Sequence, residues 1–481
     1  MTFVDRTSLR ARLAVRLSEL YGREVPAYRT LVEVAQEVNE RVLAANGSTA
    51  ERFGSLERVT AERHGAVRVG TPAELSQLAR IFGAVGMYPV GFYDLRDAHP
   101  QPIPVISTAF RPLDRDELAA NPFRVFTSML VPQDRRFFDA DLEARLTRFL
   151  EARTLFPAEL LELADRSEAG DGLGADDADR FLDLATASFA LSAEPVDRAW
   201  YAELEAISGV AADIGGVTTT HINHLTPRVL DIDDLYRSMT ERGIEMIDAI
   251  QGPPAWDGPE VLLRQTSFRA LAEPRRFRDP DGTLTDGTLR VRFGEVEARG
   301  IALTPLGRAR YDELMLKVEE AVAGDPGRPR QELAAGIWSV GMPSTERELE
   351  RQGLAYFSYH LAGSGWAPPR TRTGRGGHAG SGAAPAELDR LLDDGSVILR
   401  PIVYEDFLPR SAAGIFSSNL SRDTTMDESA DHAPRDATWL TERINRHIHV
   451  PEETYAAESH ASLRAIEAAL GLTISPRRIG N

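Results

Sequence analysis

Two histidines that hold matching positions in two similar segments carry the strongest chemical signal in the sequence. His64 and His224 are each followed, four residues later, by an arginine, Arg68 and Arg228. The chain has no cysteine, so any metal ion would have to be bound by histidine and carboxylate side chains. Two histidines and one carboxylate on one face leave coordination positions open, which is typical of Fe(II) sites that react with oxygen. The pair therefore predicts a mononuclear metal site, with a hydrogen-bonded structural role as the alternative for each histidine.

The carboxylate ligand would come from a strand-like segment that contains Glu295 and Glu297. Residues two apart in a strand point to the same face of a sheet, so both carboxylates would face the same space. A solvated sheet face is the alternative explanation for such a pair. His221 is three residues before His224 and would point away from it in a regular strand. The spacing alone does not choose between Glu295 and Glu297.

Arg68 is the residue that could bind an acidic substrate beside the metal. It follows His64 by four residues and would therefore share its strand face. Arginine binds carboxylates through two parallel hydrogen bonds, which fixes the orientation of the bound acid. An ion pair with a neighbouring glutamate is the alternative, and the sequence leaves both open.

The surroundings of the two histidines repeat in the same order. Each histidine begins a strand, is followed eleven residues later by a helical leucine, Leu75 or Leu235, and then by a glycine near the helix end. Strand-like segments rich in β-branched and aromatic residues follow in both cases. We interpret this as an α+β fold of two paired βαβββ modules that form a central half-barrel sheet, with helical segments before and between them.

These patterns divide the chain into five segments. We expect an N-terminal helical segment (1–60), a first βαβββ module (61–135), a helical insertion (136–205), a second βαβββ module (206–320) and a C-terminal region (321–481). The last would contain a flexible loop at 363–385, which is rich in glycine, alanine and proline, then a strand and substrate loop at 397–420 and a closing helix.

The composition excludes several classes of function. The net charge is -18 and Lys317 is the only lysine, so no basic surface for nucleic acid is expected. No apolar run reaches the ~18–20 residues that span a bilayer, and the charged N-terminus lacks the apolar core of a signal peptide. We therefore expect a cytoplasmic protein without nucleic-acid or membrane partners; the sequence does not indicate its oligomeric state.

Long, ordered motifs between about residues 60 and 420 resemble the 2-oxoadipate dioxygenase/decarboxylase family, also called hydroxyglutarate synthase, of the vicinal oxygen chelate superfamily. The motifs are Glu62–Gly70, Gly86–Val90, Ser107–Pro112, Asn121–Thr127, His221–Arg228, Leu263–Phe268, Phe293–Glu297, Arg299–Pro305 and Tyr404–Pro409.

The resemblance implies an enzyme that uses Fe(II) to convert 2-oxoadipate and O2 to 2-hydroxyglutarate and CO2 in lysine degradation. It places the metal ligands, which also face the substrate, at His64, His224 and Glu297, the last in preference to Glu295. It places a substrate-binding arginine at Arg68. The partners would be a small 2-oxo dicarboxylic acid and O2.

The loop after Pro409 supplies further substrate contacts in the family, which fall on Arg410 and Ser411. The family pattern has valine where this chain has Arg410, so the preferred length of the 2-oxo acid is open. Segment 363–385 matches no family motif.

Three alternatives remain beside this interpretation. The same three ligands could serve an extradiol-type dioxygenase or an isomerase that acts on a related 2-oxo acid. The chain could also be a metal-free protein that binds a small molecule. The helical segments 1–60 and 138–205 could serve a structural or partner-binding role.

Overall fold

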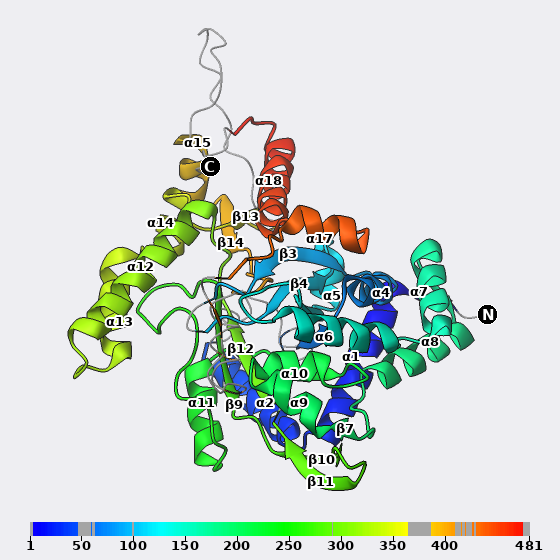
Figure 1. Ribbon diagram of the computed structural model, residues 1–481. Coiled ribbons are helices and arrows are strands. Elements are labelled where there is room, and N and C mark those ends of the chain that lie inside the picture. Colours follow the sequence, from blue (N-terminus) through cyan, green and yellow to red (C-terminus); the bar gives the residue numbers. More distant parts are fainter. Residues whose placement is uncertain are drawn as a thin grey trace, which may run out of the picture. The chain divides into compact units, whose positions relative to one another are not determined.

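The computed structural model describes residues 3–46, 59, 63–98, 101–290, 292–363, 386–408, 415, 419, 426–427 and 430–474 (Figure 1). The described strands are β1 (Phe3–Asp5), β2 (Arg63–Val69), β3 (Tyr88–Asp94), β4 (Val105–Arg111), β5 (Arg124–Leu130), β6 (Gly172–Gly174), β7 (Val196–Asp197), β8 (Ile222–Pro227), β9 (Leu263–Phe268), β10 (Glu273–Arg278), β11 (Leu284–Leu289), β12 (Gly294–Arg299), β13 (Phe357–Leu361) and β14 (Val397–Pro401). The described helices are α1 (Arg6–Glu24), α2 (Ala27–Asn46), α4 (Pro72–Gly83), α5 (Arg115–Ala120), α6 (Ala140–Ala152), α7 (Ala158–Gly170), α8 (Ala175–Ser188), α9 (Arg198–Glu205), α10 (Gly209–Gly215), α11 (Ile232–Glu241), α12 (Pro305–Gly324), α13 (Arg330–Gly341), α14 (Glu346–Arg351), α15 (Ala386–Asp393), α17 (Ala437–Ile444) and α18 (Pro451–Leu470).

A five-stranded mixed sheet brings the two histidine-bearing strands together. Its strand order is β3-β4-β5-β2-β8, with β2 parallel to β5 and antiparallel to β8. The strand, helix and three strands expected after residue 61 are present as β2, α4, β3, β4 and β5. Helix α4 begins at Pro72, where Thr71 and Glu74 form a reciprocal capping box and the proline occupies the first turn. The predicted α+β class is confirmed.

Alternation of side chains along the strands creates two different sheet faces. Val67 and Val69 of β2 join a core that includes apolar residues of α1, α2, α4, α7, α8 and α11. Phe126 and Leu130 of β5 face the other way and join a second core with α6, α9 and α10. His64 and Arg68 are on this second face, because they alternate with Val67 and Val69 along β2.

The chain forms two compact units that are discontinuous in sequence. The first comprises Met1–Gly252, Arg264–Ala298 and Asp406–Val450, and the second comprises Pro253–Leu263, Arg299–Glu405 and Pro451–Asn481. The first contains the five-stranded sheet, and the second contains the β13–β14 pair with α12–α15 and α18. The five-segment division drawn from the sequence stays a prediction.

Some elements differ from what the sequence suggested. The strand-like segment with Glu295 and Glu297 is strand β12, and before it β10 pairs with β11 in a hairpin that the sequence did not indicate. The hairpin is largely exposed and rich in arginine, so it lacks the apolar alternation that marks a buried strand. The strand expected within 397–420 is present as β14, which pairs with β13 and is alternately buried and exposed. Segment 364–385 lies outside the described residues. Among the described helices, none combines the length and apolar character that a membrane span requires.

Candidate metal site

His64 and His224 meet because their strands are neighbours in one sheet. β2 and β8 pair antiparallel with Ala66 opposite His224, and the pairing is irregular between Ala66 and Val67. The two imidazole rings lie 5.3 Å apart between centroids at an interplanar angle of 83°. Only 1% of His64 and 3% of His224 is exposed. The predicted convergence of the two histidines is therefore present in the structure, inside a water-poor environment.

Glu295 completes the group from strand β12. Its Oε2 atom lies 3.1 Å from His64 Nε2 and 3.5 Å from His224 Nε2. Thr226 Oγ1 and Gln265 Nε2 each donate a hydrogen bond of 3.3 Å to the same oxygen. One ligand atom from each of His64, His224 and Glu295 lies within 4.8 Å of the other two, so the three side chains could hold one ion.

Glu297 lies on the other side of His64 from Glu295, whereas the family resemblance implied Glu297 as the metal ligand. Its Oε2 atom lies 2.8 Å from His64 Nδ1, on the other edge of the imidazole from the atom that faces Glu295. Arg124 Nη1 lies 3.4 Å from the other carboxylate oxygen of Glu297. The geometry thus favours Glu295 as the carboxylate ligand, because only Glu295 faces the Nε2 atoms of both histidines.

The electrostatics of this group suit a divalent cation. Burial lowers the pKa of His224 to about 4, so its imidazole is neutral and able to donate a lone pair. Neither of its ring nitrogens has a hydrogen-bond partner within the described part of the chain, which is unusual for a buried polar group. Burial opposes a charge on His64, but Glu297 and Glu295 outweigh it and raise the pKa of His64. The two carboxylates therefore stabilise positive charge at this point, as a metal site must.

Aromatic side chains form part of the wall. The Phe407 ring lies 5.0 Å from that of His64, and the Phe293 ring lies 5.4 Å from that of His224. Phe126 stacks obliquely on Phe407 with centroids 4.9 Å apart. These apolar groups exclude water and so strengthen the electrostatic interactions among the polar ones.

A second group of possible ligands consists of Asp94, Asp97 and His432. Asp97 and His432 are exposed, and the Asp94 and Asp97 carboxylates form ion pairs of 2.5 Å with Arg96 and Arg136, respectively. The charges of both aspartates are already offset by arginine, so the buried group of His64, His224 and Glu295 is the better candidate for a metal site.

Arg68 forms a buried ion pair through Nη1 with Asp213 of helix α10. Asn223 Nδ2 donates a hydrogen bond of 2.8 Å to the same Asp213 oxygen, and His221 Nε2 lies 3.4 Å from the other oxygen. The ion-pair alternative for Arg68 is thus present, but with an aspartate rather than a glutamate. A guanidinium has five N–H donors, so this pair is compatible with substrate binding as well. Asp213 was not predicted as a site residue, because the small residues around it in the sequence gave no chemical signal.

The remaining predicted site residues, Arg410 and Ser411, lie outside the described residues. Their role in substrate binding stays a prediction.

A family model and several sequence relatives that match this chain carry the same description. The family model for 2-oxoadipate dioxygenase/decarboxylase matches residues 13–419. The chain is 56% identical over 449 residues to the 2-oxoadipate dioxygenase/decarboxylase of Mycobacterium tuberculosis, covering 93% of this chain and 96% of the relative. It is 39% identical over 477 residues to the enzyme of the same name from Pseudomonas putida, covering 98% of each chain.

A solved structure also matches over nearly the whole chain. The crystal structure of the hydroxyglutarate synthase from Pseudomonas putida in complex with 2-oxoadipate superimposes with a TM-score of 0.80 at 36% sequence identity. The match covers 98% of this chain and 100% of the other.

Proposed function

Because the chain belongs to the 2-oxoadipate dioxygenase/decarboxylase family, we propose that it converts 2-oxoadipate and O2 to 2-hydroxyglutarate and CO2 at the buried group of His64, His224 and Glu295. The observation that carries the proposal is the convergence of these three ligands in a family of this activity. The reaction balances without another reductant: the substrate loses C1 as CO2, which keeps the two oxygens of that carboxylate, and both atoms of O2 enter 2-hydroxyglutarate, one in the new carboxylate and one in the hydroxyl group.

The metal at this site is Fe(II) in our proposal. His64, His224 and Glu295 would hold the ion, a set of two imidazoles and one carboxylate that suits Fe(II), and bound iron would supply the activation of oxygen that the protein's own groups lack. Glu295 replaces Glu297 as the proposed ligand, since its carboxylate lies beside both Nε2 atoms.

Glu297 has a supporting task in this proposal. A carboxylate beside Nδ1 of a metal-binding histidine fixes the tautomer with the proton on Nδ1, so that Nε2 presents its lone pair to the metal. The 2.8 Å separation between Glu297 Oε2 and His64 Nδ1 fits this arrangement. Arg124 lies on the other side of Glu297 and holds that carboxylate in place through their ion pair.

Arg68 binds a carboxylate of the substrate. Arg68 follows His64 by four residues on the same face of β2, and only 4% of it is exposed. A charge-assisted hydrogen bond in such a buried position orients the acid and offsets its negative charge. The wall of Phe126, Phe293 and Phe407 excludes competing water.

Oxygen uptake by anaerobically purified, Fe(II)-loaded protein given 2-oxoadipate tests the proposal. We expect one O2 consumed and one 2-hydroxyglutarate and one CO2 formed per substrate, with the product identified by mass. An extradiol-type dioxygenase would consume O2 without releasing CO2, and an isomerase would consume none. Iron-loaded protein that is inert with 2-oxoadipate and with shorter 2-oxo acids would refute the proposal.

A further inference from the structure

The ion pair between Arg68 and Asp213 is almost completely buried. Each residue is 4% exposed, and Asp213 belongs to helix α10, which packs against β2. The Asp213 oxygen that receives Arg68 Nη1 also accepts the hydrogen bond from Asn223 Nδ2. Asn223 of β8 therefore holds the Asp213 carboxylate in place. The carboxylate in turn orients the edge of the Arg68 guanidinium that carries Nη1.

The ionised state of Asp213 is favoured despite its burial. Burial raises the pKa of a carboxyl, but the neighbouring His221 and Arg68 and the hydrogen bonds from Arg68 and Asn223 outweigh that effect and lower the pKa of Asp213. An ionised carboxylate is a stronger acceptor than a neutral one and a fixed counter-charge for arginine. Removing it would leave the guanidinium in a buried site without this partner, free to turn towards other acceptors.

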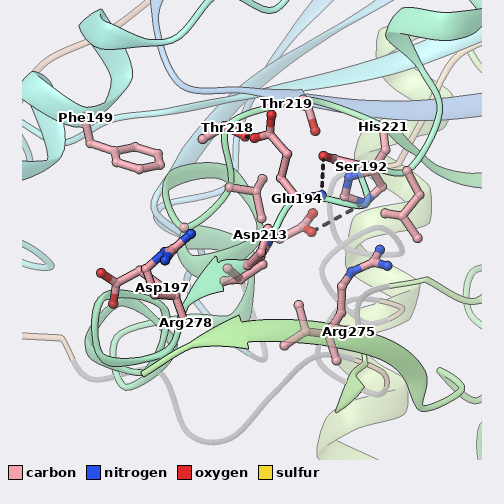
Figure 2. A pocket seen from close by; sticks show the side chains of 16 residues that line it. Phe149, Ser192, Glu194, Asp197, Asp213, Thr218, Thr219, His221, Arg275 and Arg278 are labelled. Atoms are coloured by element: carbon pink, nitrogen blue, oxygen red, sulfur yellow. Dashed lines mark hydrogen bonds and ion pairs between the residues drawn. The ribbon is translucent and has the colours of Figure 1, made fainter. Parts of the chain in front are cut away.

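The other side of Asp213 borders a cavity of about 200 Å³ (Figure 2). The cavity is lined by polar side chains, among them Asp213, His221 and Arg275, and by apolar ones, among them Phe149 and Val196. Figure 2 shows His221 above Asp213 with the contact between them drawn. A cavity of this size is large enough to admit a small carboxylate next to the Asp213 side chain.

We infer that Asp213 is the positioning residue for Arg68, holding its guanidinium in the orientation that receives a carboxylate of the 2-oxo acid. The inference rests on the proposed substrate role of Arg68. Asp213 itself touches no reacting atom; it acts through Arg68, and its loss therefore changes substrate binding more than it changes metal binding or oxygen chemistry.

The experiment compares Asp213→Ala and Asp213→Asn with Arg68→Ala in the Fe(II)-loaded full chain. We expect both Asp213 variants to retain stoichiometric iron and to show a KM for 2-oxoadipate raised by about 10- to 100-fold, the effect of one charge-assisted hydrogen bond, with a smaller change in kcat. Asp213→Asn keeps the shape and one acceptor, so it is the milder variant and the one that tests the inference if Asp213→Ala does not fold. Asp183→Asn, which alters a surface ion pair with Arg16, is the matched control and should leave KM unchanged.

The cavity allows a chemical rescue that a general loss of stability would not show. Formate is a one-carbon carboxylate that can enter the cavity and take the place vacated in Asp213→Ala. We expect formate to lower the raised KM of Asp213→Ala saturably, and to have no such effect on Arg68→Ala or on the unaltered enzyme.

The outcomes distinguish the positioning role of Asp213 from the proposed function of the enzyme. A normal KM in a folded, iron-loaded Asp213→Asn, beside a large effect of Arg68→Ala, overturns the positioning role and leaves the proposed function intact. A raised KM in Asp213→Ala that formate does not lower also overturns it, because the effect is then structural. Unchanged kinetics in Arg68→Ala remove the substrate role on which the inference rests.

Discussion

Glu295 and Glu297 show how two identical side chains on one face of a strand take different positions around one histidine. The two-residue period of β12 turns both towards the second sheet face, as the sequence indicated, and both are at most 3% exposed. The sequence could not decide which one meets the metal, because that depends on how β12 lies against β2 and β8. The structure separates them by the two edges of the His64 ring.

Removing the two carboxylates one at a time should give different results. Glu295→Ala should abolish stoichiometric iron binding, since it removes a ligand from the open three-residue site. Glu297→Gln should still bind one iron, with affinity lower by about 10- to 100-fold, the usual effect of losing a group that orients a metal-binding histidine. Iron content after anaerobic loading and a competition titration measure the two effects. The reverse order, with Glu297→Gln free of iron and Glu295→Ala loaded, would restore Glu297 as the ligand, as the family resemblance implied.

At the scale of elements, helices and strands with a clear local sequence pattern were predicted well. Pairings between segments that are distant in the sequence were not predicted. The capping box at Thr71 and Glu74 and the strand, helix and three strands after residue 61 follow from local sequence chemistry. The same holds for the repeat of histidine, arginine, leucine and glycine that pointed to His64 and His224. The exposed hairpin β10–β11 and the contact of Asp213 with Arg68 were missed, because each depends on partners distant in the sequence or on side chains without a periodic signal.

Gly294 precedes Glu295 in β12 and leaves the space that the Phe268 ring occupies. A Cβ atom at Gly294 would fall 1.9 Å from Cε1 of Phe268, on the strand β9 that pairs with β12. Gly294→Ala should therefore force β9 and β12 apart and lower the free energy of unfolding by about 1–3 kcal/mol, as overpacked cores do. Iron affinity should fall with it, because Glu295 is the next residue.

Denaturant unfolding and iron titration of Gly294→Ala measure these effects. Gly336→Ala is the matched control: it lies inside helix α13 with no heavy atom within 4 Å of the added Cβ, so it should be neutral or slightly stabilising. Equal behaviour of the two variants would show that the β9–β12 contact does not constrain the site.

At the scale of the whole molecule, the buried histidines couple stability to pH. Burial lowers the pKa of both His221 and His224 to about 4, whereas each has a pKa of about 6.5 in an unfolded chain. Between these values the unfolded state binds more protons than the folded state, so stability must fall as pH falls. The pKa of His64 is instead raised in the folded state. The contribution of His64 to stability therefore changes only at pH values above its pKa in the unfolded chain.

The metal-free protein should therefore lose stability between about pH 6.5 and pH 4, by up to about 1.4 kcal/mol per pH unit for each of the two histidines. Urea unfolding at several pH values in the presence of a chelator measures the slope, and His221→Gln should reduce it by about half. A stability that is flat or rising towards pH 4 would contradict the neutral, buried state of these side chains.

The division of the chain into two compact units, each discontinuous in sequence, is also a feature of the whole molecule, and no local sequence pattern indicated it.

The most direct test of the central claim is the position of the metal. Crystals of the anaerobically iron-loaded protein, measured at the iron absorption edge, locate the ion by its anomalous scattering. The account predicts one strong peak between His64 Nε2, His224 Nε2 and the Glu295 carboxylate, with Glu297 remaining on His64 Nδ1. A peak bound by Glu297 instead, or iron bound only at Asp94, Asp97 and His432, would contradict it.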